Sequence, residues 1–405
     1  MNYHRFIIAI AVVLSVLTVS GQNTDGGEDF LLSSIERNNT TLIALRTEAE
    51  ARKLENRTGI TLADPEVGYK HMWEGGEESG NLSELTVTQS IDLATVMGQR
   101  TRVAREQNLL IDEEYRMARM EILLDAQLTL VDLAYYNALA AELDRRLGHA
   151  RRVVEAERTR LESGDTDALS HNNVLLSLSA LEAEEARIEM ERNVLIARLT
   201  ALNGGVTLDN LESLDALENL ESLDNIENLD FSSWYAEAEA HLPQLAQARQ
   251  MSEVRSGELA LAKASHLPSL SATYINERHT VGTRSQGVAV GVSIPLWANK
   301  NRVRSARTAL QAAEAQQADA ELQLRSAFEQ EFTRVKGLHH TAMLYRRALD
   351  EANNSTLLEK AMDEGYISVL EYLQGIELYY DYLDRSLSAD RDYHRALATL
   401  EAWRL

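Results

Sequence analysis

Residues 287–296 read Gly-Val-Ala-Val-Gly-Val-Ser-Ile-Pro-Leu, so large apolar side chains alternate with small ones. Successive side chains of a β-strand point to opposite faces. This stretch would therefore have one apolar face, with Val288, Val290 and Val292, and one face of small residues. A strand of about ten residues with this alternation is typical of a transmembrane β-strand. A hairpin on a soluble sheet is the alternative, because alternation by itself is a weak indication.

A similar stretch occurs earlier in the chain, where Leu85, Val87 and Ile91 alternate with small or polar residues. The two stretches belong to an internal repeat, since Ser90-Ile-Asp-Leu93 and Ser293-Ile-Pro-Leu296 lie 203 positions apart. Further along, Arg160-Leu-Glu-Ser-Gly164 and Ala361-Met-Asp-Glu-Gly365 lie 201 positions apart. Matching landmarks in the same order indicate a duplication of about 200 residues.

Each half is predicted to contain a helix, a β-hairpin, a very long helix, a tight turn and a shorter helix. In the first repeat, residues 21–205, these cover 31–58, 65–94, 98–162, the turn near Gly164, and 167–203. In the second repeat, residues 232–405, they cover 233–265, 268–297, 299–362, the turn near Gly365, and 367–403. The long helices repeat apolar residues every seven positions, for example Leu110, Met117 and Leu124, which indicates coiled-coil packing.

The composition agrees with long, uninterrupted elements. The chain of 405 residues has only 4 prolines and 20 glycines, the residues that turns use most. It has no cysteine, which excludes disulfides and a lipidated N-terminal cysteine. Its 63 acidic and 40 basic residues give a formal charge of −23, and nucleic acid is excluded as a partner because phosphate binding needs a basic footprint.

The N-terminus is predicted to be a secretory signal peptide over residues 1–20. Arg5 precedes a nearly apolar run from Phe6 to Leu17, and small residues follow. An uncleaved membrane anchor is the alternative, but the run is shorter than the roughly 20 residues of a comfortable membrane span.

Two hairpins give four strands per chain, and four strands cannot close a barrel. Open strand edges do not survive in lipid, so strands that span a membrane must be shared between chains. Three chains would supply twelve strands, a number within the usual range of outer-membrane barrels.

With these features the chain resembles the TolC family of outer-membrane efflux proteins, over roughly residues 31–404. The resemblance rests on the duplicated layout, on the strand exit Ser293-Ile-Pro-Leu296, and on the paired turns 160–169 and 361–370. It implies a mainly α fold with a small β part: a coiled-coil α-barrel, and four strands in a shared twelve-stranded trimeric transmembrane β-barrel. It also implies a homotrimer in the outer membrane that extends into the periplasm. The implied partners are outer-membrane lipid, a periplasmic adaptor (membrane fusion) protein and an inner-membrane pump.

The paired turns are the candidate gate. A glycine at a helix end relieves the left-handed cap conformation, and acids at the start of the next helix favour its dipole, so capping alone would explain these residues. Ser368 is a candidate cap of the second turn. Acids repeated threefold at a pore constriction would instead form a ring that attracts cations. The gate candidates are Asp165, Asp167, Asp363, Glu364 and Glu371, and the resemblance makes Gly164, Leu169, Gly365 and Leu370 candidate adaptor contacts.

An acidic tract of triplets over residues 208–231 lies between the repeats, within a predicted linker or equatorial segment at 206–231. An apolar residue leads each triplet and Asp or Glu follows it. On a helix the apolar positions would wrap around the axis and form no single face. We therefore expect the tract to be a solvated linker. The alternative is a collar packed on the outside of the α-barrel.

No arrangement of residues indicates an enzyme. The ten histidines are scattered, and neither a zinc-protease, a serine-hydrolase nor a phosphate-loop motif is present. We therefore expect no catalytic residue, cofactor or metal site. The expected function is an exit duct that passes small molecules or metal cations from a periplasmic pump to the exterior. A periplasmic coiled-coil structural or adaptor protein anchored at the membrane is the alternative.

Overall fold

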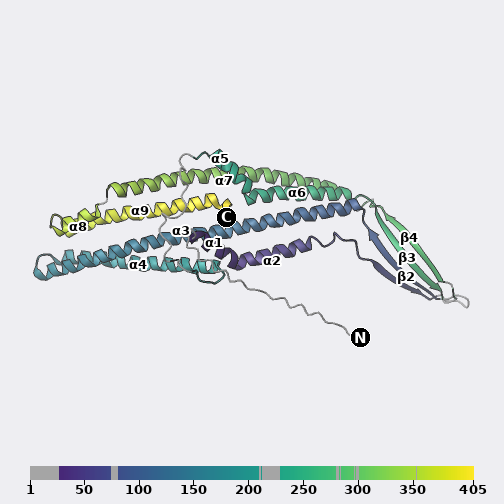
Figure 1. Ribbon diagram of the computed structural model, residues 1–405, viewed down its shortest axis with the longest axis horizontal. Coiled ribbons are helices and arrows are strands. Elements are labelled where there is room, and N and C mark those ends of the chain that lie inside the picture. Colours follow the sequence, from purple (N-terminus) through teal and green to yellow (C-terminus); the bar gives the residue numbers. More distant parts are fainter. Residues whose placement is uncertain are drawn as a thin grey trace, which may run out of the picture.

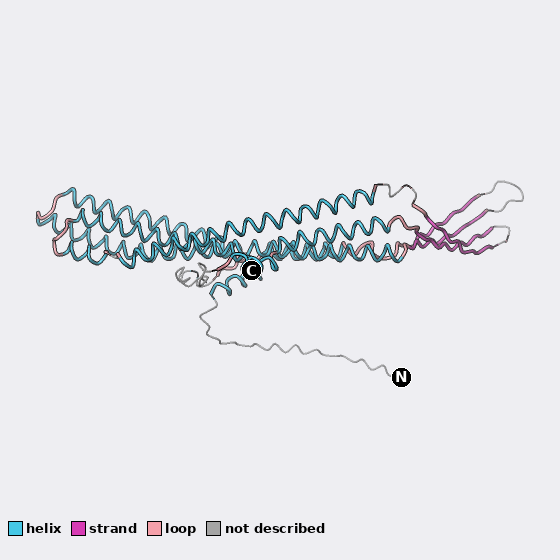
Figure 2. The backbone as a smooth tube through the Cα atoms, turned by 90° about the horizontal axis from the view of Figure 1, so that it is seen from above, coloured by secondary structure: helices cyan, strands magenta, loops and turns pink. Residues whose placement is uncertain are grey.

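The chain is described by a computed structural model that covers residues 27–73, 81–208, 211, 229–279, 282, 284–295, 297, 301–352 and 354–405. The expected signal peptide and most of the triplet tract lie outside these residues. The molecule is a long rod, with helices along most of its length and a sheet at one end (Figures 1 and 2). The prediction of a mainly α fold with a small β part is confirmed.

The elements follow the same order in both halves. The first half contains α1 (Gly27–Asn38), α2 (Thr40–Glu55), β1 (Glu66–Met72), β2 (Leu82–Ile91), α3 (Ala94–Ser163) and α4 (Ala168–Leu202). The second half contains α5 (Phe231–His241), α6 (Pro243–Ala264), β3 (Ser269–His279), β4 (Arg284–Ser293), α7 (Arg302–Glu351), α8 (Ser355–Asp363) and α9 (Val369–Glu401), then a 3-10 turn, Ala402–Arg404. α3 has 70 residues and is about 105 Å long at 1.5 Å per residue.

Three helices that were predicted to be continuous are interrupted. Asn39 separates α1 from α2, accepting a hydrogen bond from the Leu42 N–H at 2.9 Å while its amide donates to the Leu202 carbonyl at 2.8 Å. Pro243 begins α6 at the first helical position, where its missing N–H costs nothing. α7 ends at Glu351 and α8 begins at Ser355, and the sequence between them contains two asparagines, which are weak helix formers.

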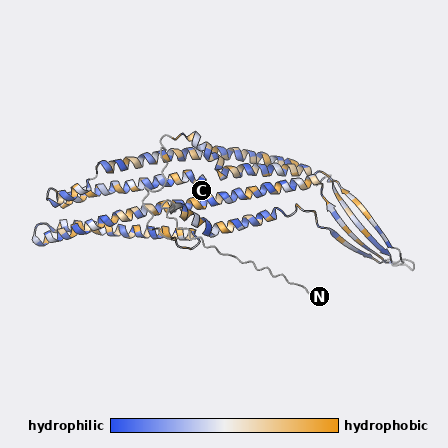
Figure 3. Cartoon of the chain, in the orientation of Figure 1, coloured by the Kyte–Doolittle hydropathy of each residue, from blue (hydrophilic) through white to orange (hydrophobic). Residues whose placement is uncertain are grey.

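The four strands form one antiparallel sheet in the order β1-β2-β3-β4. β2 and β3 join the two halves, and Thr88 and Thr273 share a hydroxyl–hydroxyl hydrogen bond of 3.0 Å. One face carries an apolar row formed by Val67, Val87, Tyr274 and Val288; the other carries Gly68, Thr86, Ile275 and Gly287. Val288 and Val290 are 75% and 76% exposed, so no described residue covers this part of the apolar face. Figure 3 shows the alternation along the strands.

The helices pack as two antiparallel pairs, α3 with α4 and α7 with α9, and α3 also lies against α6 and α9. The buried core is a series of clusters along the rod. One joins α1, α3 and α4 through Ile35, Leu130 and Leu199, and another joins α5, α7 and α9 through Trp234, Phe332 and Leu400. Within the described residues, no helix combines the length and the apolar content that crossing a membrane requires.

Candidate functional site

The two predicted turns lie together at the end of the rod opposite the sheet (Figures 1 and 2). We call residues 164–167 the first tip turn and residues 364–368 the second tip turn. Behind them a buried cluster joins α3, α4 and α9 through Val153, Val174, Val369, Tyr372 and Ile376. The fold therefore brings together the gate candidates of both halves, although about 200 positions separate them.

The first tip turn is closed by its glycine. Gly164 has a φ of 81°, and the N–H of Asp165 donates to the Arg160 carbonyl at 2.8 Å. Asp167 caps α4, because its carboxylate accepts a hydrogen bond from the Ser170 N–H at 2.8 Å. That bond holds the pKa of Asp167 below its usual range. Asp167 therefore has a structural role whether or not it also faces a pore.

A buried acid that the sequence did not single out supports this turn. Glu157 of α3 is 1% exposed, and its two oxygens accept hydrogen bonds from Arg160 at 2.7 Å and from the Thr166 hydroxyl at 2.9 Å. It thus ties the last turns of α3 to the tip. Its sequence context, one acid among many on a charged helix, gave no indication of burial.

The second tip turn has the same construction with a different cap. Gly365 has a φ of 76°, and the Tyr366 N–H donates to the Ala361 carbonyl at 2.8 Å. Ser368 caps α9, as predicted, and Glu371 completes a capping box by accepting from the Ser368 N–H at 2.8 Å. This bond lowers the pKa of Glu371. Glu371, like Asp167, is thus engaged in a helix cap.

The side chains of the other three gate candidates are exposed at the tips, and none of them accepts a hydrogen bond from the first turn of a helix that the structure describes. Asp165 accepts a hydrogen bond from the Ser163 hydroxyl at 2.8 Å, and Glu364 lies 3.9 Å from Lys360, four residues before it. Asp363 is the last residue of α8. The candidate contact residues Leu169 and Leu370 are 70% and 54% exposed, one beside each turn.

Polar contacts link the tip regions of the two halves. The hydroxyl of Tyr372 on α9 lies against Nε2 of His149 on α3, and Glu359 of α8 lies 3.4 Å from the other ring nitrogen. Burial lowers the pKa of His149 and raises that of Tyr372, so both side chains are neutral near pH 7. The tyrosine hydroxyl and the imidazole share a hydrogen bond, which holds α9 to α3 close to the tip.

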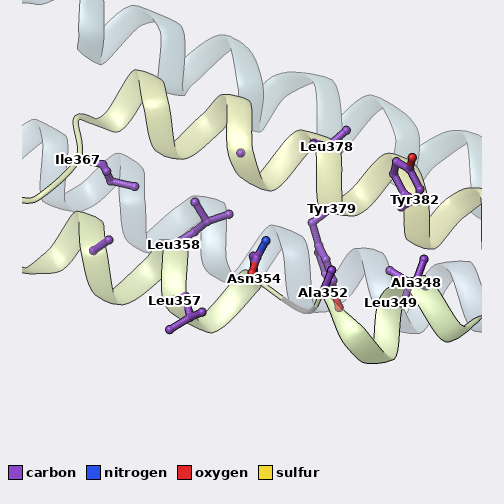
Figure 4. Close-up of a pocket in the computed structure, with 12 residues that line it drawn as sticks. Ala348, Leu349, Ala352, Asn354, Leu357, Leu358, Ile367, Leu378, Tyr379 and Tyr382 are labelled. Carbon is purple, nitrogen blue, oxygen red and sulfur yellow. The ribbon is translucent and has the colours of Figure 1, made fainter.

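An apolar cavity of about 640 Å³ lies behind the second tip turn, where α7 gives way to α8 (Figure 4). α8 contributes Leu357 and Leu358 to its lining, the turn contributes Ile367, and α9 contributes Leu378, Tyr379 and Tyr382. Gly375 lies at its wall, where a Cβ atom would come 2.8 Å from Leu358 Cδ2. The cavity lies at the interruption between α7 and α8, since Ala352 and Asn354 also line it.

Comparison with known structures identifies the fold. The chain is similar to a membrane protein from Pseudomonas aeruginosa, with a TM-score of 0.75 at 17% identity, over 94% of this chain and 90% of that one. It is similar to the channel protein CusC, with a TM-score of 0.76 at 13% identity, over 100% and 98% of the two chains. It is also similar to the outer membrane channel MtrE of Neisseria gonorrhoeae, with a TM-score of 0.69 at 14% identity, over 93% and 88%. The fold is therefore that of outer-membrane channels.

A family model matches the second half of the sequence. Residues 234–403 match the family model described as outer membrane efflux protein. The matched family and the similar structures are outer-membrane efflux proteins and channels, which agrees with the function expected from the sequence. A comparison with curated proteins gives no match. Among the described residues, no group of three or more His, Asp or Glu side chains is arranged to hold a metal ion.

Proposed function

We propose that the chain is one protomer of a homotrimeric exit duct in a tripartite efflux system. The observation that carries this proposal is the uncovered sheet. β1 and β4 each pair on one side only within the described residues, and the apolar face is exposed. Because strand edges must be satisfied in lipid, the sheet needs neighbouring copies, and three copies give a closed barrel of twelve strands.

The helices support the same assembly. Exposed apolar side chains lie on α4, at Leu176 and Met190, and on α7, at Leu322 and Leu344. A monomer would leave these in water, whereas neighbouring protomers would cover them and close a helical tunnel. In this arrangement residues 21–205 and 232–405 are the two repeats of each protomer, and 206–231 is a linker at the equator.

We assign the gate to the tip turns. The carboxylates of Asp165, Asp363 and Glu364 are exposed there, so three copies would place a ring of carboxylates at the inner end of the tunnel. Asp167 and Glu371 would add to its field while they cap helices. Gly164, Leu169, Gly365 and Leu370 would meet the periplasmic adaptor, which connects the duct to an inner-membrane pump. The cargo would be small molecules or metal cations.

The assembly is tested by expression with the native N-terminus in a two-membrane bacterium that lacks its own exit duct. We expect the protein in the outer-membrane fraction, and the unheated detergent-solubilised protein at three times the mass of the chain. A monomer, or absence from that fraction, would refute the trimeric duct.

The gate is tested in planar bilayers. The D363N/E364Q variant should lose part of the cation preference of the wild-type channel, because six carboxylates would leave the constriction. Glu189→Gln, an exposed change in the middle of α4, is the matched control and should leave ion selectivity unchanged. Equal selectivity of D363N/E364Q and wild type would show that these acids do not line the pore.

A further inference from the structure

A row of basic side chains crosses the apolar face of the sheet at the end away from the helices. The strand register pairs His71 with Ser83, Ser83 with Arg278, and Arg278 with Arg284. Because side chains alternate along each strand, this row shares its face with Val67, Val87, Tyr274 and Val288. The row therefore borders the uncovered apolar surface.

This face differs in charge from the rest of the molecule. The chain has 63 acids against 40 bases, yet none of the described residues on this face of the strands is Asp or Glu. The opposite face carries Glu66, Glu84 and Glu277, together with Lys70. Basic side chains without acids are thus confined to the side that would point away from the barrel lumen.

Arg278 and Arg284 are directly opposite each other, and both are exposed. Like charges in that position destabilise a sheet. Neither arginine forms an ion pair with any residue that the structure describes. An anion that binds both guanidinium groups would remove this repulsion, and phosphate oxygens match the planar guanidinium fork.

The depth of the row fits a membrane surface. Ile294 continues the apolar alternation just past β4, and Arg284 lies ten positions before it. Ten residues rise about 34 Å along a strand at about 3.4 Å each, and a tilt of about 40° reduces this to about 26 Å of height. The apolar band of outer-membrane barrels is about 25 Å tall, so the row falls at its upper border, where lipid phosphates lie.

Aromatic side chains occupy the same border. Trp73 is exposed, and its ring stands edge-on to that of His71, with 4.8 Å between the ring centroids. Tyr69, two residues before His71 on β1, is also exposed. Aromatic rings at this level are typical of the membrane–water interface.

We propose that His71, Arg278 and Arg284 form a binding site for the phosphorylated headgroup of an anionic lipid of the outer leaflet. The proposal rests on the proposed function, because it requires the apolar face of the sheet to face lipid. Each protomer would hold one headgroup, with the acyl chains along the valines of β4.

The test is binding of diphosphoryl lipid A to the purified full-length protein in a neutral detergent, followed by native mass spectrometry. We expect R278Q/R284Q to bind at least tenfold more weakly than wild type, and R278K/R284K to fall between the two. Lys70→Gln, which removes a base from the opposite face of β1, is the matched control and should bind as wild type does. Inorganic phosphate at the same concentration should not displace the lipid.

Equal binding by wild type and R278Q/R284Q would overturn the proposal, as would equally effective displacement by inorganic phosphate, which would indicate a site for the free ion. Outer-membrane fractionation and oligomer mass are measured on the same samples. If these fail for wild type, the duct itself is wrong; if they hold while lipid binding is unaffected by the arginine changes, only the lipid site is wrong.

Discussion

Arg146 of α3 and Asp384 of α9, 238 positions apart, form a two-bonded ion pair with distances of 2.7 and 3.1 Å. The guanidinium is 8% exposed, contacts Glu142 at 3.2 Å, and lies 4.2 Å from the centre of the Tyr380 ring. The pKa of Arg146 is raised, because its acidic partners outweigh the effect of burial. This contact connects the two halves of the chain, between the tip-side quarter of α3 and the middle of α9.

Removing the acid of this pair should destabilise the protein more than removing the base. Asp384→Ala would leave a buried guanidinium with one acid fewer, and we expect a loss of about 2 kcal/mol in the free energy of unfolding, the scale of a charged hydrogen bond. Arg146→Met should cost less, about 1 kcal/mol, because Asp384 is half exposed and regains water. Urea unfolding followed by helical circular dichroism measures both.

Asp381→Ala is the control on the same helix. It breaks an exposed pair with Arg385, 2.9 Å apart, which should contribute less than about 1 kcal/mol. If Asp384→Ala costs no more than Asp381→Ala, the pair between α3 and α9 is not a stabilising link.

Acid should destabilise the fold through His394. Burial is the main cause that lowers the pKa of His394 to about 4, and the nearby charge of Arg346 lowers it further. The ordinary value is about 6.5, so between these two values the unfolded chain binds a proton that the native protein does not. The contribution of His394 to the free energy of unfolding is fully present above about pH 6.5. It declines as the pH falls to about 4 and changes no further below that.

This decline amounts to about 3 kcal/mol at most, from 1.36 kcal/mol for each unit of pKa. His394→Gln removes the titrating group, so its unfolding free energy should depend less steeply on pH between about 6.5 and 4. Unfolding midpoints measured across that range in both proteins make the comparison. Parallel curves would mean that His394 is protonated as easily in the native state as in the unfolded chain.

The sequence could predict those parts of the tip that depend on neighbouring residues. Gly164, Gly365 and the Ser368 cap follow from local backbone chemistry, and the structure has each of them in place. Glu157 could not be found, because its burial depends on how the tip folds back over α3, and the chain has 63 acids to choose from. The link from Arg146 to Asp384 depends on packing between distant helices, which a single sequence does not reveal.

The helix breaks are an intermediate case. Pro243 is a strong local indication of a helix start, and Asn354 next to another asparagine is a weaker one, yet the apolar pattern continues across both. Heptad periodicity therefore predicted that these segments are helical, and it did not indicate where the helices are interrupted. The cavity beside α8 lies at one such interruption.

Gly164 should tolerate asparagine better than valine. Its φ of 81° lies in the left-handed region, and no atom within 4 Å would meet an added Cβ, so the cost arises from the backbone alone. Gly164→Val should lose about 1–2 kcal/mol and impair export while the trimer persists. Gly164→Asn should be milder, because asparagine visits this conformation. If export is unaffected by valine, the first tip turn is not part of the functional end.

Gly375 of α9 packs against Leu358 of α8, and a substitution at Gly375 should act through that side chain. An added Cβ would lie 2.8 and 3.1 Å from the two methyl carbons of Leu358, so both branches of that side chain are in the way. Gly375→Ala should therefore cost about 1–3 kcal/mol through overpacking, although alanine favours a helix.

Gly337→Ala on α7 is the matched control, since a Cβ there meets nothing within 4 Å, and it should stabilise the protein slightly. The decisive measurement is the double variant G375A/L358A. Removing the leucine branches makes room for the new Cβ, so the two changes together should destabilise less than the sum of the single changes. If the losses of the two single changes simply add in the double variant, Gly375→Ala does not act through Leu358. The packing at Gly375 would then not determine the position of α8.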